Sequence, residues 1–421
     1  MREGWKQVSL NELGFVGRGK SRHRPRNAEF LYNGPYPFIQ TGDVEAARFY
    51  INSYSQTYSD LGLAQSKLWP KGTLCISIVG ANTGASAILG FDACFPDSII
   101  CFTANETKSD VKFVKYTLEL MRSELKSISQ GAARENLSLE KLLSIKFLVP
   151  DVLIQKKIVS DINPYDDLIE NNLKRIKLLE EKAQLTYEEW FVKMRFPGYE
   201  TAKFDDVTGL PEGWEKKEFQ YFGKVITGKT PSTKNELFFD GNIPFVKTPD
   251  MAGFPYVLDC SQQLSELGGN SQQNKFIPKN TLMISCIGSA GAFALASEDC
   301  QTNQQINSII FYQEYYTFYF YCLAKGLKPI LEGLGSNGAT MTNVNKSKFE
   351  KIDAVFPELQ LLKHYHDIVK NNFEIILALQ KQNRLLKEAR DILLPRLMSG
   401  MIDVDSITGQ VGAEMEMIKN R

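Results

Sequence analysis

Two long segments of the chain place apolar side chains on alternating steps of four and three residues. They cover residues 152–195 and 359–398, and neither contains a glycine. This spacing is typical of a coiled coil, in which two helices bury their apolar seams against each other. In the first segment the predicted seam consists of Ile158, Ile162, Tyr165, Ile169, Asn172, Ile176, Leu179, Ala183, Thr186 and Trp190. In the second segment it consists of Ile368, Asn372, Ile375, Leu379, Gln382, Leu386, Ala389 and Leu393.

A second explanation of these stripes is that each helix packs only on its own globular domain. Two matching stripes in one chain favour mutual burial of the helices instead. Polar residues such as Asn172 and Asn372 interrupt both seams. Because such interruptions tend to fix the register of a helix pair at some cost in stability, we expect one defined register.

The segments that precede the two helices are rich in glycine, proline, aromatic and β-branched residues. Short apolar runs within them, T-L-C-I-S-I-V at 73–79 and T-L-M-I-S-C-I at 281–287, predict strands. A chain of 421 residues with 43% hydrophobic content can bury two cores. We therefore expect an α+β protein with two globular domains and helical connectors.

The chain is a duplication of one unit, which is its most specific feature. Gly4-Trp5 returns as Gly213-Trp214. Three longer blocks also recur. The runs G-P-Y-P-F-I-Q-T-G-D-V at 34–44, P-K-G-T-L-C-I-S-I-V-G at 70–80 and Q-G-A-A-R-E-N at 130–136 return as G-N-I-P-F-V-K-T-P-D-M at 241–251, P-K-N-T-L-M-I-S-C-I-G at 278–288 and N-G-A-T-M-T-N at 337–343.

The duplication predicts the order of the domains. We expect two duplicated mixed α/β domains separated by two long antiparallel coiled-coil helices, related by pseudo-twofold symmetry. The last residues contain Ser, Gly and Glu without periodicity, so they are predicted to be disordered. The expected boundaries are 1–150 for the first domain, 151–196 for the central helix, 197–357 for the second domain, 358–400 for the C-terminal helix and 401–421 for the tail.

Residues 14–21 and 223–230 both match the phosphate-binding pattern G-x-x-x-x-G-K-[ST]. A working P-loop needs a buried strand before it and a helix after it. Neither match follows a continuous apolar run, and Pro25 and Pro231 oppose a helix behind them. We therefore expect no nucleotide site. A nucleotide hydrolase is kept as an alternative that would lose turnover if Lys20 and Lys229 were replaced.

Charge is unevenly distributed although Lys plus Arg and Asp plus Glu both number 49. The segment from Arg18 to Arg26 contains five basic residues and no acid, and its counterpart, T-G-K-T-P-S-T-K-N at 227–235, is also free of acid. Such a run is often only a solvated loop. Two equivalent loops that are basic or rich in hydroxyl groups, on a duplicated scaffold, favour two half-sites of duplex DNA.

The remaining chemistry of the chain excludes several classes of site. Seven scattered cysteines without a C-x-x-C pair predict reduced thiols and no zinc site, and Cys94 and Cys300 are expected to be buried. No secretory signal or membrane-length apolar run is present, so we expect a cytoplasmic protein. Pro96-Asp97 and Asp110-Val111-Lys112 have nuclease-like spacing, but Asp110 is predicted to open a helix.

Two further segments carry a family resemblance. They are L-L-E-E-K-A-Q-L-T-Y-E-E-W-F-V-K-M-R-F-P-G at 178–198 and L-L-K-E-A-R-D-I-L-L-P-R-L-M-S-G at 385–400. Together with the Gly-Trp openings and the P-K-x-T-L blocks, they resemble the DNA sequence-specificity (S) subunits of type I restriction-modification systems. The resemblance covers residues 1 to about 403.

The resemblance implies a non-catalytic DNA-binding subunit. Each domain would be a target recognition domain, and the paired helices would be a spacer that holds two adenine-N6 methyltransferase (M) subunits and, through them, restriction (R) subunits with motor activity. S-adenosylmethionine and the methylation active site would belong to the M subunits, so no cofactor is expected in this chain. The partners would flip an adenine out of the duplex in each half-site.

The DNA-binding residues are predicted from their ability to contact phosphates or base edges. Phosphate contacts are assigned to Arg18, Lys20, Arg26, Lys229 and Lys234, with His23 in the same loop. Base reading in the major groove is assigned to Arg22, Arg24, Asn27, Arg134 and Asn136 in the first domain, and to Ser232, Thr233, Lys247, Asn337, Thr340 and Asn343 in the second. The alternative for each is an ordinary turn or cap residue.

The helices would also act as a ruler between the half-sites. A coiled coil from Ile158 to Trp190 would be about 50 Å long, so the half-site centres should lie somewhat more than one DNA turn apart, with an unread gap between them. A scaffold protein whose domains bind other proteins is a further alternative. It would show no sequence-dependent DNA protection and no steep response to salt.

Overall fold

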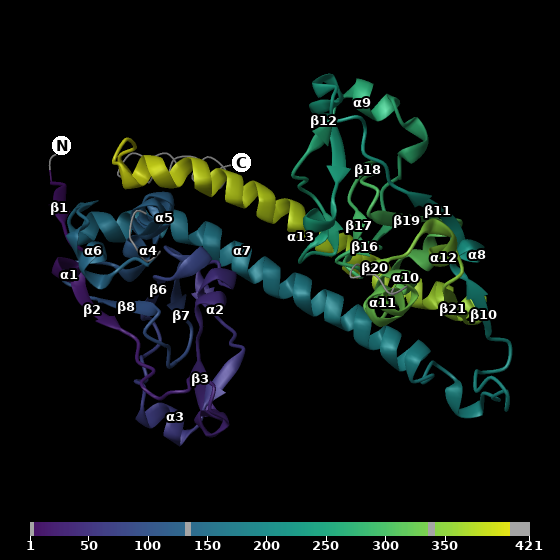
Figure 1. Ribbon diagram of the computed structural model, residues 1–421, viewed down its shortest axis with the longest axis horizontal. Coiled ribbons are helices and arrows are strands. Elements are labelled where there is room, and N and C mark those ends of the chain that lie inside the picture. Colours follow the sequence, from purple (N-terminus) through teal and green to yellow (C-terminus); the bar gives the residue numbers. More distant parts are fainter. Residues whose placement is uncertain (1–3, 131–135, 336–341, 405–421) are drawn as a thin grey trace, which may run out of the picture. The chain divides into compact units, whose positions relative to one another are not determined.

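The computed structural model describes residues 4–130, 136–335 and 342–404. The chain divides into two compact units, one formed by Met1–Leu168 and Leu386–Arg421 and the other by Ile169–Leu385. Each unit combines a mixed α/β domain with parts of two long helices, α7 (Val152–Tyr187) and α13 (Leu359–Met398) (Figure 1). The predicted α+β class with two repeated domains and long helices is therefore confirmed.

The first unit is built around a five-stranded sheet in the order β2-β8-β6-β7-β4. Its neighbours are antiparallel except β4 and β7. These strands are β2 (Gly14–Arg18), β4 (Tyr50–Ile51), β6 (Leu74–Ser77), β7 (Ser86–Leu89) and β8 (Ile99–Ala104). The other elements are β1 (Lys6–Val8), α1 (Leu10–Leu13), β3 (Tyr32–Phe38), α2 (Thr41–Ala46), β5 (Gln56–Tyr58), α3 (Asp60–Ala64), α4 (Val111–Leu120), α5 (Arg122–Gln130), α6 (Leu139–Ser144) and β9 (Phe147–Val149).

The second unit repeats this topology with a sheet in the order β11-β19-β15-β17-β13. These strands are β11 (Gly223–Thr227), β13 (Tyr256–Val257), β15 (Leu282–Ser285), β17 (Phe293–Ala296) and β19 (Ile306–Phe311). The other elements are β10 (Glu215–Glu218), α8 (Phe219–Phe222), β12 (Phe239–Val246), β14 (Gln263–Leu264), α9 (Glu266–Asn270), β16 (Ile287–Gly288), β18 (Gln301–Thr302), α10 (Thr317–Ala324), α11 (Lys328–Gly335), β20 (Thr342–Asn343), α12 (Lys346–Glu350) and β21 (Asp353–Phe356).

The central strands arise from the apolar runs that the sequence singles out. All four residues of β6 are buried, because both faces of the sheet are covered. Leu74 and Ile76 pack with Phe113 of α4 in one core, whereas Cys75 packs with Trp69 in another. A strand buried on both faces is continuously apolar rather than alternating, which explains the sequence of β6 and of its counterpart β15.

In the first unit the long helices pack against each other in opposite directions. Ile158 and Ile162 of α7 lie in the same core as Leu394 and Leu397 of α13. Further along α7, Asp166 accepts a hydrogen bond at 2.5 Å from the Arg390 guanidinium of α13 and one at 2.6 Å from the Tyr116 hydroxyl of α4. Residues later in α7 thus contact residues earlier in α13, so the pairing is antiparallel.

In the second unit the same two helices pair through a polar layer and an apolar one. The Asn172 amide donates to Gln382 Oε1 and to Asn383 Oδ1, both at 2.9 Å. The Tyr365 hydroxyl donates to the Ala183 carbonyl oxygen at 3.0 Å, and Ile176 packs in the core that contains Leu379. The pairing is again antiparallel. The expected mutual burial of the two stripes is confirmed in both units.

The predicted seam of α13 is only partly correct. All ten predicted seam positions of the first segment are buried or half-buried, nine of them in α7 and Trp190 in the π-helical turn Glu188–Val192 that follows, but Gln382 and Ala389 of α13 are exposed. Their places in the seam are taken by Asn383 and by Arg390, which lies beside Asp166. The error arises because α13 buries a second face against the second domain, where Phe373 stacks on Phe318 at 4.3 Å. Its apolar stripe is therefore too wide for the spacing alone to define the seam.

The cysteines and the helices bear on two further expectations. All seven cysteines are free thiols. Cys94 and Cys300 are buried as predicted, and burial raises the pKa of the Cys94 thiol to about 11. Over the part of the chain that the structure describes, no helix has both the length and the apolar character needed to cross a membrane.

Replacing Asn172 by leucine tests the polar layer between the helices. The Asn172 side chain is fully buried, and Asn383 is also buried. The variant leaves the Asn383 amide without its hydrogen-bond donor, and an unsatisfied buried polar group costs about 1–3 kcal/mol. We expect the free energy of unfolding of the second unit to fall by about that amount in urea titrations followed by the fluorescence of Trp190 and Trp214.

Two further variants control this measurement. The double variant N172L/N383L should recover most of the lost stability, because both amides are then replaced by apolar side chains. Lys381→Ala should change the free energy of unfolding by less than about 0.5 kcal/mol, because Lys381 is exposed and takes no part in the polar layer. An N172L protein as stable as the parent would show that the layer contributes nothing to the pairing.

Candidate nucleic-acid interface

The first five residues of each glycine-lysine motif form a strand rather than a phosphate-binding turn, and the glycine-lysine loop follows that strand. Residues Gly14–Arg18 pair with β8, and Gly223–Thr227 pair with β19 in the equivalent register. A P-loop directs successive backbone N–H groups toward phosphates, whereas these residues hydrogen-bond in a sheet ladder. The predicted mismatch between the motif and its structural context is confirmed, and the geometry does not support a nucleotide site.

Several loop ends converge on one edge of the sheet in the first unit. Arg18 at the end of β2 lies opposite Ile100, and Ser77 at the end of β6 lies opposite Ile99, so both strands end beside the start of β8. Asn136 forms an isolated bridge with Val79, just beyond β6. The basic loop after Arg18 and the segment containing Asn136 therefore share this edge.

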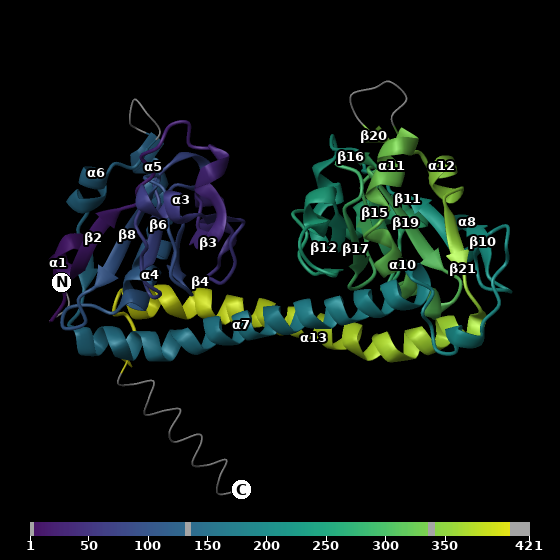
Figure 2. The same ribbon diagram turned by 90° about the horizontal axis from the view of Figure 1, so that it is seen from below.

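The second unit gathers the equivalent residues at the equivalent edge. Thr227 at the end of β11 lies opposite Asn307, and Ser285 at the end of β15 lies opposite Ile306. Asn343 pairs with Ile287 just beyond β15, and Lys247 follows Val246, whose carbonyl accepts from Asn303 N–H at 3.1 Å. Figure 2 shows β16 and β20 at the end of the second domain that faces away from its portion of α13.

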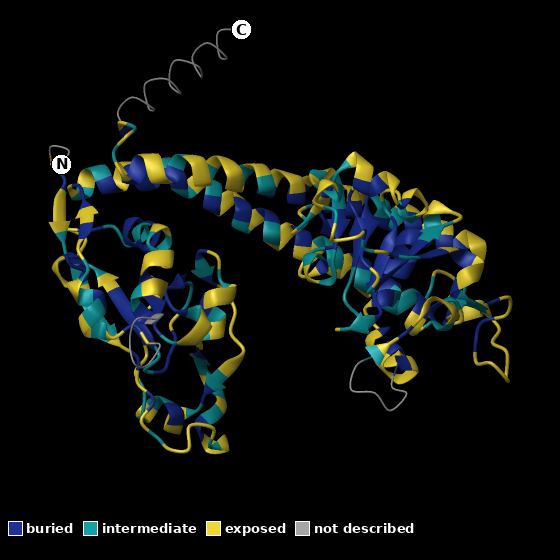
Figure 3. Ribbon diagram, turned by 45° about the horizontal axis from the view of Figure 1, so that its top comes forward, coloured by how far each residue is buried: buried dark blue, intermediate teal, exposed yellow. Residues whose placement is uncertain are grey.

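The loop of the first unit is anchored through its backbone. Lys20 N–H donates to the Phe95 carbonyl at 3.0 Å, and the Lys20 carbonyl accepts from the Ser66 hydroxyl at 2.8 Å. The Gln65 side-chain oxygen accepts from the backbone N–H groups of Arg22 and His23. The loop backbone is thus fixed by Phe95 and by two residues that directly follow α3, whereas most residues of the loop are exposed (Figure 3).

The side chains of this loop differ in how free they are. The side chains of Lys20, Arg22 and Asn27 are exposed and form no hydrogen bond or ion pair with any described residue. Arg24 donates through Nη1 to the carbonyls of Ser21 and His23, at 2.7 and 2.8 Å. His23 is half-buried, with its ring edge-on to Phe30 at 5.0 Å. Two of these five predicted contact residues, Arg24 and His23, are therefore already engaged within the loop.

Asp97 holds the two remaining arginines. Arg26 Nη2 donates to both carboxylate oxygens of Asp97, at 2.8 and 2.9 Å, and Arg18 Nε donates to the Asp97 backbone carbonyl. Both arginines are exposed at the edge. The sequence assigns phosphate contacts to both arginines, and these hydrogen bonds restrict their orientation.

The second loop is anchored in the same way but carries fewer charges. Lys229 N–H donates to the Thr302 carbonyl at 2.9 Å, and the Gln272 amide donates to the Lys229 carbonyl at 2.7 Å. Ser232, Thr233 and Lys234 are exposed, whereas Lys247 is half-buried. The predicted residues Arg134, Asn337 and Thr340 lie outside the described residues.

Sequence reasoning missed the glutamines that anchor both loops. Gln65 and Gln272 each follow the short helix of their unit, α3 or α9, and each bonds the backbone of the glycine-lysine loop. Both stand in repeated stretches that begin S-[DE]-L-G, at 59–62 and 265–268. Counted from these stretches, Gln272 corresponds to Ser66, and both side chains donate to the carbonyl of the loop lysine. Polar residues just after the repeated stretch were the available signal.

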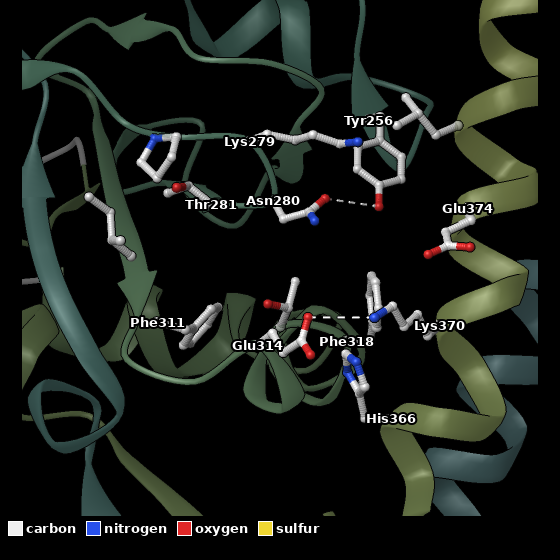
Figure 4. A pocket seen from close by; sticks show the side chains of 14 residues that line it. Tyr256, Lys279, Asn280, Thr281, Phe311, Glu314, Phe318, His366, Lys370 and Glu374 are labelled. Carbon is white, nitrogen blue, oxygen red and sulfur yellow. Dashed lines mark hydrogen bonds and ion pairs between the residues drawn. The ribbon is translucent and has the colours of Figure 1, made fainter. Parts of the chain in front are cut away.

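The opposite edge of the second unit's sheet contains a polar pocket of about 270 Å³. Figure 4 shows Lys370 projecting from α13 toward Glu314, with which it forms an ion pair at 3.6 Å. The Tyr256 hydroxyl, on another side of the pocket, donates to Asn280 Oδ1 at 3.3 Å. His366 is 5% exposed, its ring nitrogens have no hydrogen-bond partner among the described residues, and burial lowers its pKa. None of the described residues predicted to bind DNA lines this pocket.

A pocket of about 460 Å³ occupies the equivalent edge in the first unit. Its walls include Pro70, Lys71 and Thr73, and the pocket of the second unit includes the matching Pro278, Lys279 and Thr281. These residues belong to the repeated P-K-x-T turn. Because the turn is the same in both copies, this edge is unsuited to distinguishing two different half-sites.

The nuclease-like arrangement of Asp97, Asp110 and Lys112 does not exist as a site. Asp110 is the N-cap of α4, and its carboxylate accepts from the backbone N–H groups of Lys112 and Phe113, at 2.8 and 3.3 Å. Asp97 is paired with Arg26 at the other end of β8. The prediction that Asp110 opens a helix is confirmed. Among the described residues, no group of His, Cys, Asp and Glu is arranged to hold a metal ion.

Comparison with known proteins agrees with this geometry. The sequence model of the family described as Type I restriction modification DNA specificity domain matches the chain twice, at residues 2–181 and 211–389. The HindI specificity subunit of Haemophilus influenzae is 27% identical, over 94% of this chain and 99% of the relative. The MjaIX specificity subunit of Methanocaldococcus jannaschii is 24% identical, over 96% and 94% of the two chains.

A solved structure shows the same fold. It is the S subunit of a type I restriction-modification system from M. genitalium, with a TM-score of 0.59, 16% sequence identity and coverage of 93% of this chain and 96% of that one. The family model covers most of the chain in two copies, which match the two repeated domains and their helices. The chain therefore belongs to the type I restriction-modification specificity subunits, the non-catalytic components that recognise DNA in these systems.

Proposed function

We propose that the chain recognises a bipartite duplex DNA target, with each repeated domain reading one half-site in the major groove. The observation that supports this most directly is the sheet edge at which β2 and β6, or β11 and β15, end beside β8 or β19. In both units this edge carries exposed polar loops on an anchored backbone. Differences between the two loops would give the half-sites different sequences.

The exposed side chains at this edge suit two kinds of contact. Lys20, Lys229 and Lys234 are exposed cations that would bind phosphates and set the register of the protein on the duplex. Base edges would be read by side chains that offer several donors or acceptors. In the described part of the chain these are Arg22, Arg24, Asn27 and Asn136 in the first domain, and Ser232, Thr233, Lys247 and Asn343 in the second.

The long helices would hold two M subunits. Leu178 and Leu185 of α7 are 64% and 60% exposed, and Leu385 and Ile392 of α13 are 61% and 59% exposed. Each pair is seven residues apart, so its members lie on one face of the helix, and the two pairs occupy matching places in the repeated segments L-L-E-E-K-A-Q-L and L-L-K-E-A-R-D-I. A partner that binds one apolar pair can bind the other, which supports two copies of one partner.

The partners would supply the chemistry. We propose that the M subunits bind S-adenosylmethionine and methylate adenine N6, and that R subunits join through them. The helices α7 and α13 have 36 and 40 residues, and 36 helical residues extend about 54 Å. A spacer of this length would keep an unread gap between the half-sites.

Removing the exposed lysines tests the phosphate contacts. Each phosphate contact contributes about 0.9 to the slope of log K against log salt concentration. For a duplex containing the target, we expect Lys20→Ala and Lys229→Ala each to make this slope shallower by about that amount without changing the preferred sequence. The measurement is fluorescence anisotropy across a salt series, with the chain in complex with its M subunits.

The exposed Lys182 of α7 provides the matched control, because it lies on a spacer helix and not at the sheet edge. Lys182→Ala should leave the slope unchanged. Equal slopes for the parent and for both loop variants would contradict a phosphate role for these loops.

Charged substitutions in the apolar pairs test the docking of the M subunits. Placing glutamate at two exposed leucines forces a carboxylate into the contact, and burying an unpaired charge is strongly unfavourable. We expect L178E/L185E and L385E/I392E each to reduce the number of M subunits per chain from two to one, measured by the mass of the co-purified complex. The control is Lys156→Glu, at an exposed position near the start of α7 and far from both pairs, which should leave two M subunits. Two M subunits on both double variants would show that docking lies elsewhere.

A further inference from the structure

Asp97 is an acidic residue in the middle of a basic edge. Its carboxylate accepts from Arg26 Nη2 at 2.8 and 2.9 Å, and its carbonyl accepts from Arg18 Nε. The Arg26 and Asp97 side chains are 47% and 37% exposed. One residue in the turn before β8 therefore orients both arginines that flank the loop.

Neither stability nor phosphate binding accounts for this arrangement. An ion pair exposed to this degree contributes little to folding, because solvent screens it and two long side chains must be ordered. A carboxylate also repels DNA phosphates and offsets part of the charge of the loop. What the pair does provide is orientation, since an arginine that is already held loses less conformational freedom when it binds.

The hydrogen bonds leave a defined recognition group exposed. Arg18 uses only Nε, so its two terminal nitrogens have no hydrogen-bond partner among the described residues. These nitrogens form the planar fork that matches O6 and N7 of guanine in the major groove. Arg18 is the last residue of β2, so its backbone is held in the sheet. The fork is therefore presented from a rigid element.

We propose that Arg18 reads a guanine in the half-site of the first domain, and that Asp97, together with Arg26, is the pair that positions it. This inference rests on the proposed function and replaces the phosphate role that the sequence predicts for Arg18. Arg26 keeps the charge of Asp97 balanced, so the carbonyl and carboxylate of one residue hold the two guanidinium groups side by side.

The second domain has no such device and serves as an internal comparison. Thr227 ends β11 where Arg18 ends β2, and its hydroxyl donates to Asn307 at 2.6 Å. Gln304 occupies the turn before β19, and its side-chain oxygen accepts from the Thr230 hydroxyl at 2.6 Å. The second domain thus has no arginine fork at this place, and the guanine contact belongs to one half-site only.

The test is a map of modified adenines in cells whose DNA otherwise lacks this modification. The full chain, or a variant, is expressed with its M subunit, and base preferences are determined at every position around the methylated adenines. Arg18→Lys keeps the charge but removes the fork. We expect it to relax the preference for guanine at one position of one half-site by about 5- to 150-fold, while the other half-site is unchanged.

Three further variants separate reading from folding and from phosphate binding. Arg18→Gln should shift the same position toward adenine, which a glutamine amide can read; a variant that failed to fold could not do so. Asp97→Asn should relax the same position in part, because Arg26 is no longer held beside Arg18 by a charged carboxylate, although the backbone carbonyl that Arg18 uses remains. Lys20→Ala should lower methylation at all sites and leave every base preference unchanged.

Two results would overturn the inference. One is an Arg18→Lys map that resembles the Lys20→Ala map, with uniform loss and no change in preference. The other is a recognised sequence in which neither half-site contains a G·C pair. If Arg18→Lys relaxed the guanine preference and Asp97→Asn did not, only the positioning role of the Asp97 side chain would be overturned. A parent chain that supports no bipartite pattern would instead overturn the proposed function itself.

Discussion

The antiparallel pairing of α7 with α13 is the interaction on which both domains depend. The core of each unit joins residues that are far apart along the chain. The first unit needs Leu394, Leu397 and Met398 from the C-terminal helix, and the second needs Ile176 and Ala183 from the central one. Segments that are far apart along the chain must therefore come into contact before either core is complete. Such non-local contacts impose an entropic cost on folding that local helix formation does not.

Specific polar contacts define how the helices meet. Apolar seams alone allow a helix pair to slip by one heptad, whereas a polar layer resists slipping because its groups would lose their partners. Asn172 contacts Gln382 and Asn383 in the second unit, and Asp166 contacts Arg390 in the first. Tyr116 of α4 also donates to Asp166. Burial raises the pKa of Asp166, and the neighbouring Arg390 opposes that rise.

Each repeated domain divides its tasks between two edges of one sheet. One edge faces the helices and carries the same P-K-x-T turn in both copies, with Lys71 in one and Lys279 in the other. The other edge has an anchored loop whose side chains differ between copies. Ser66 and Gln272 donate to the carbonyls of Lys20 and Lys229 and so anchor the two loops alike. The scaffold can therefore stay constant while the reading side chains vary. This separation allows two different half-sites to be recognised by one duplicated fold.

The sequence predicted features that depend on local patterns and on repetition. The apolar run of β6, the helices and the equivalence of the two loops all follow from residues that are close together or repeated. The seam of α13 was partly wrong because Phe373 and Leu377 make its apolar face wider than a simple heptad. The restraint of Arg18 and Arg26 by Asp97 could not be predicted, since it joins residues about 70 to 80 positions apart. The pockets beside the helices depend on such distant contacts as well.

The most direct test of this account shortens the spacer and leaves every strand of both domains in place. Residues 169–175 of α7 and the facing residues 380–386 of α13 can be deleted together, which removes one heptad from each helix. Modified adenines are then mapped with the M subunit present. Seven helical residues span about 10 Å, or about three base pairs. We expect the same two half-sites with a gap shorter by about that number, and an unchanged gap between intact half-sites would contradict the role of the helices as a spacer.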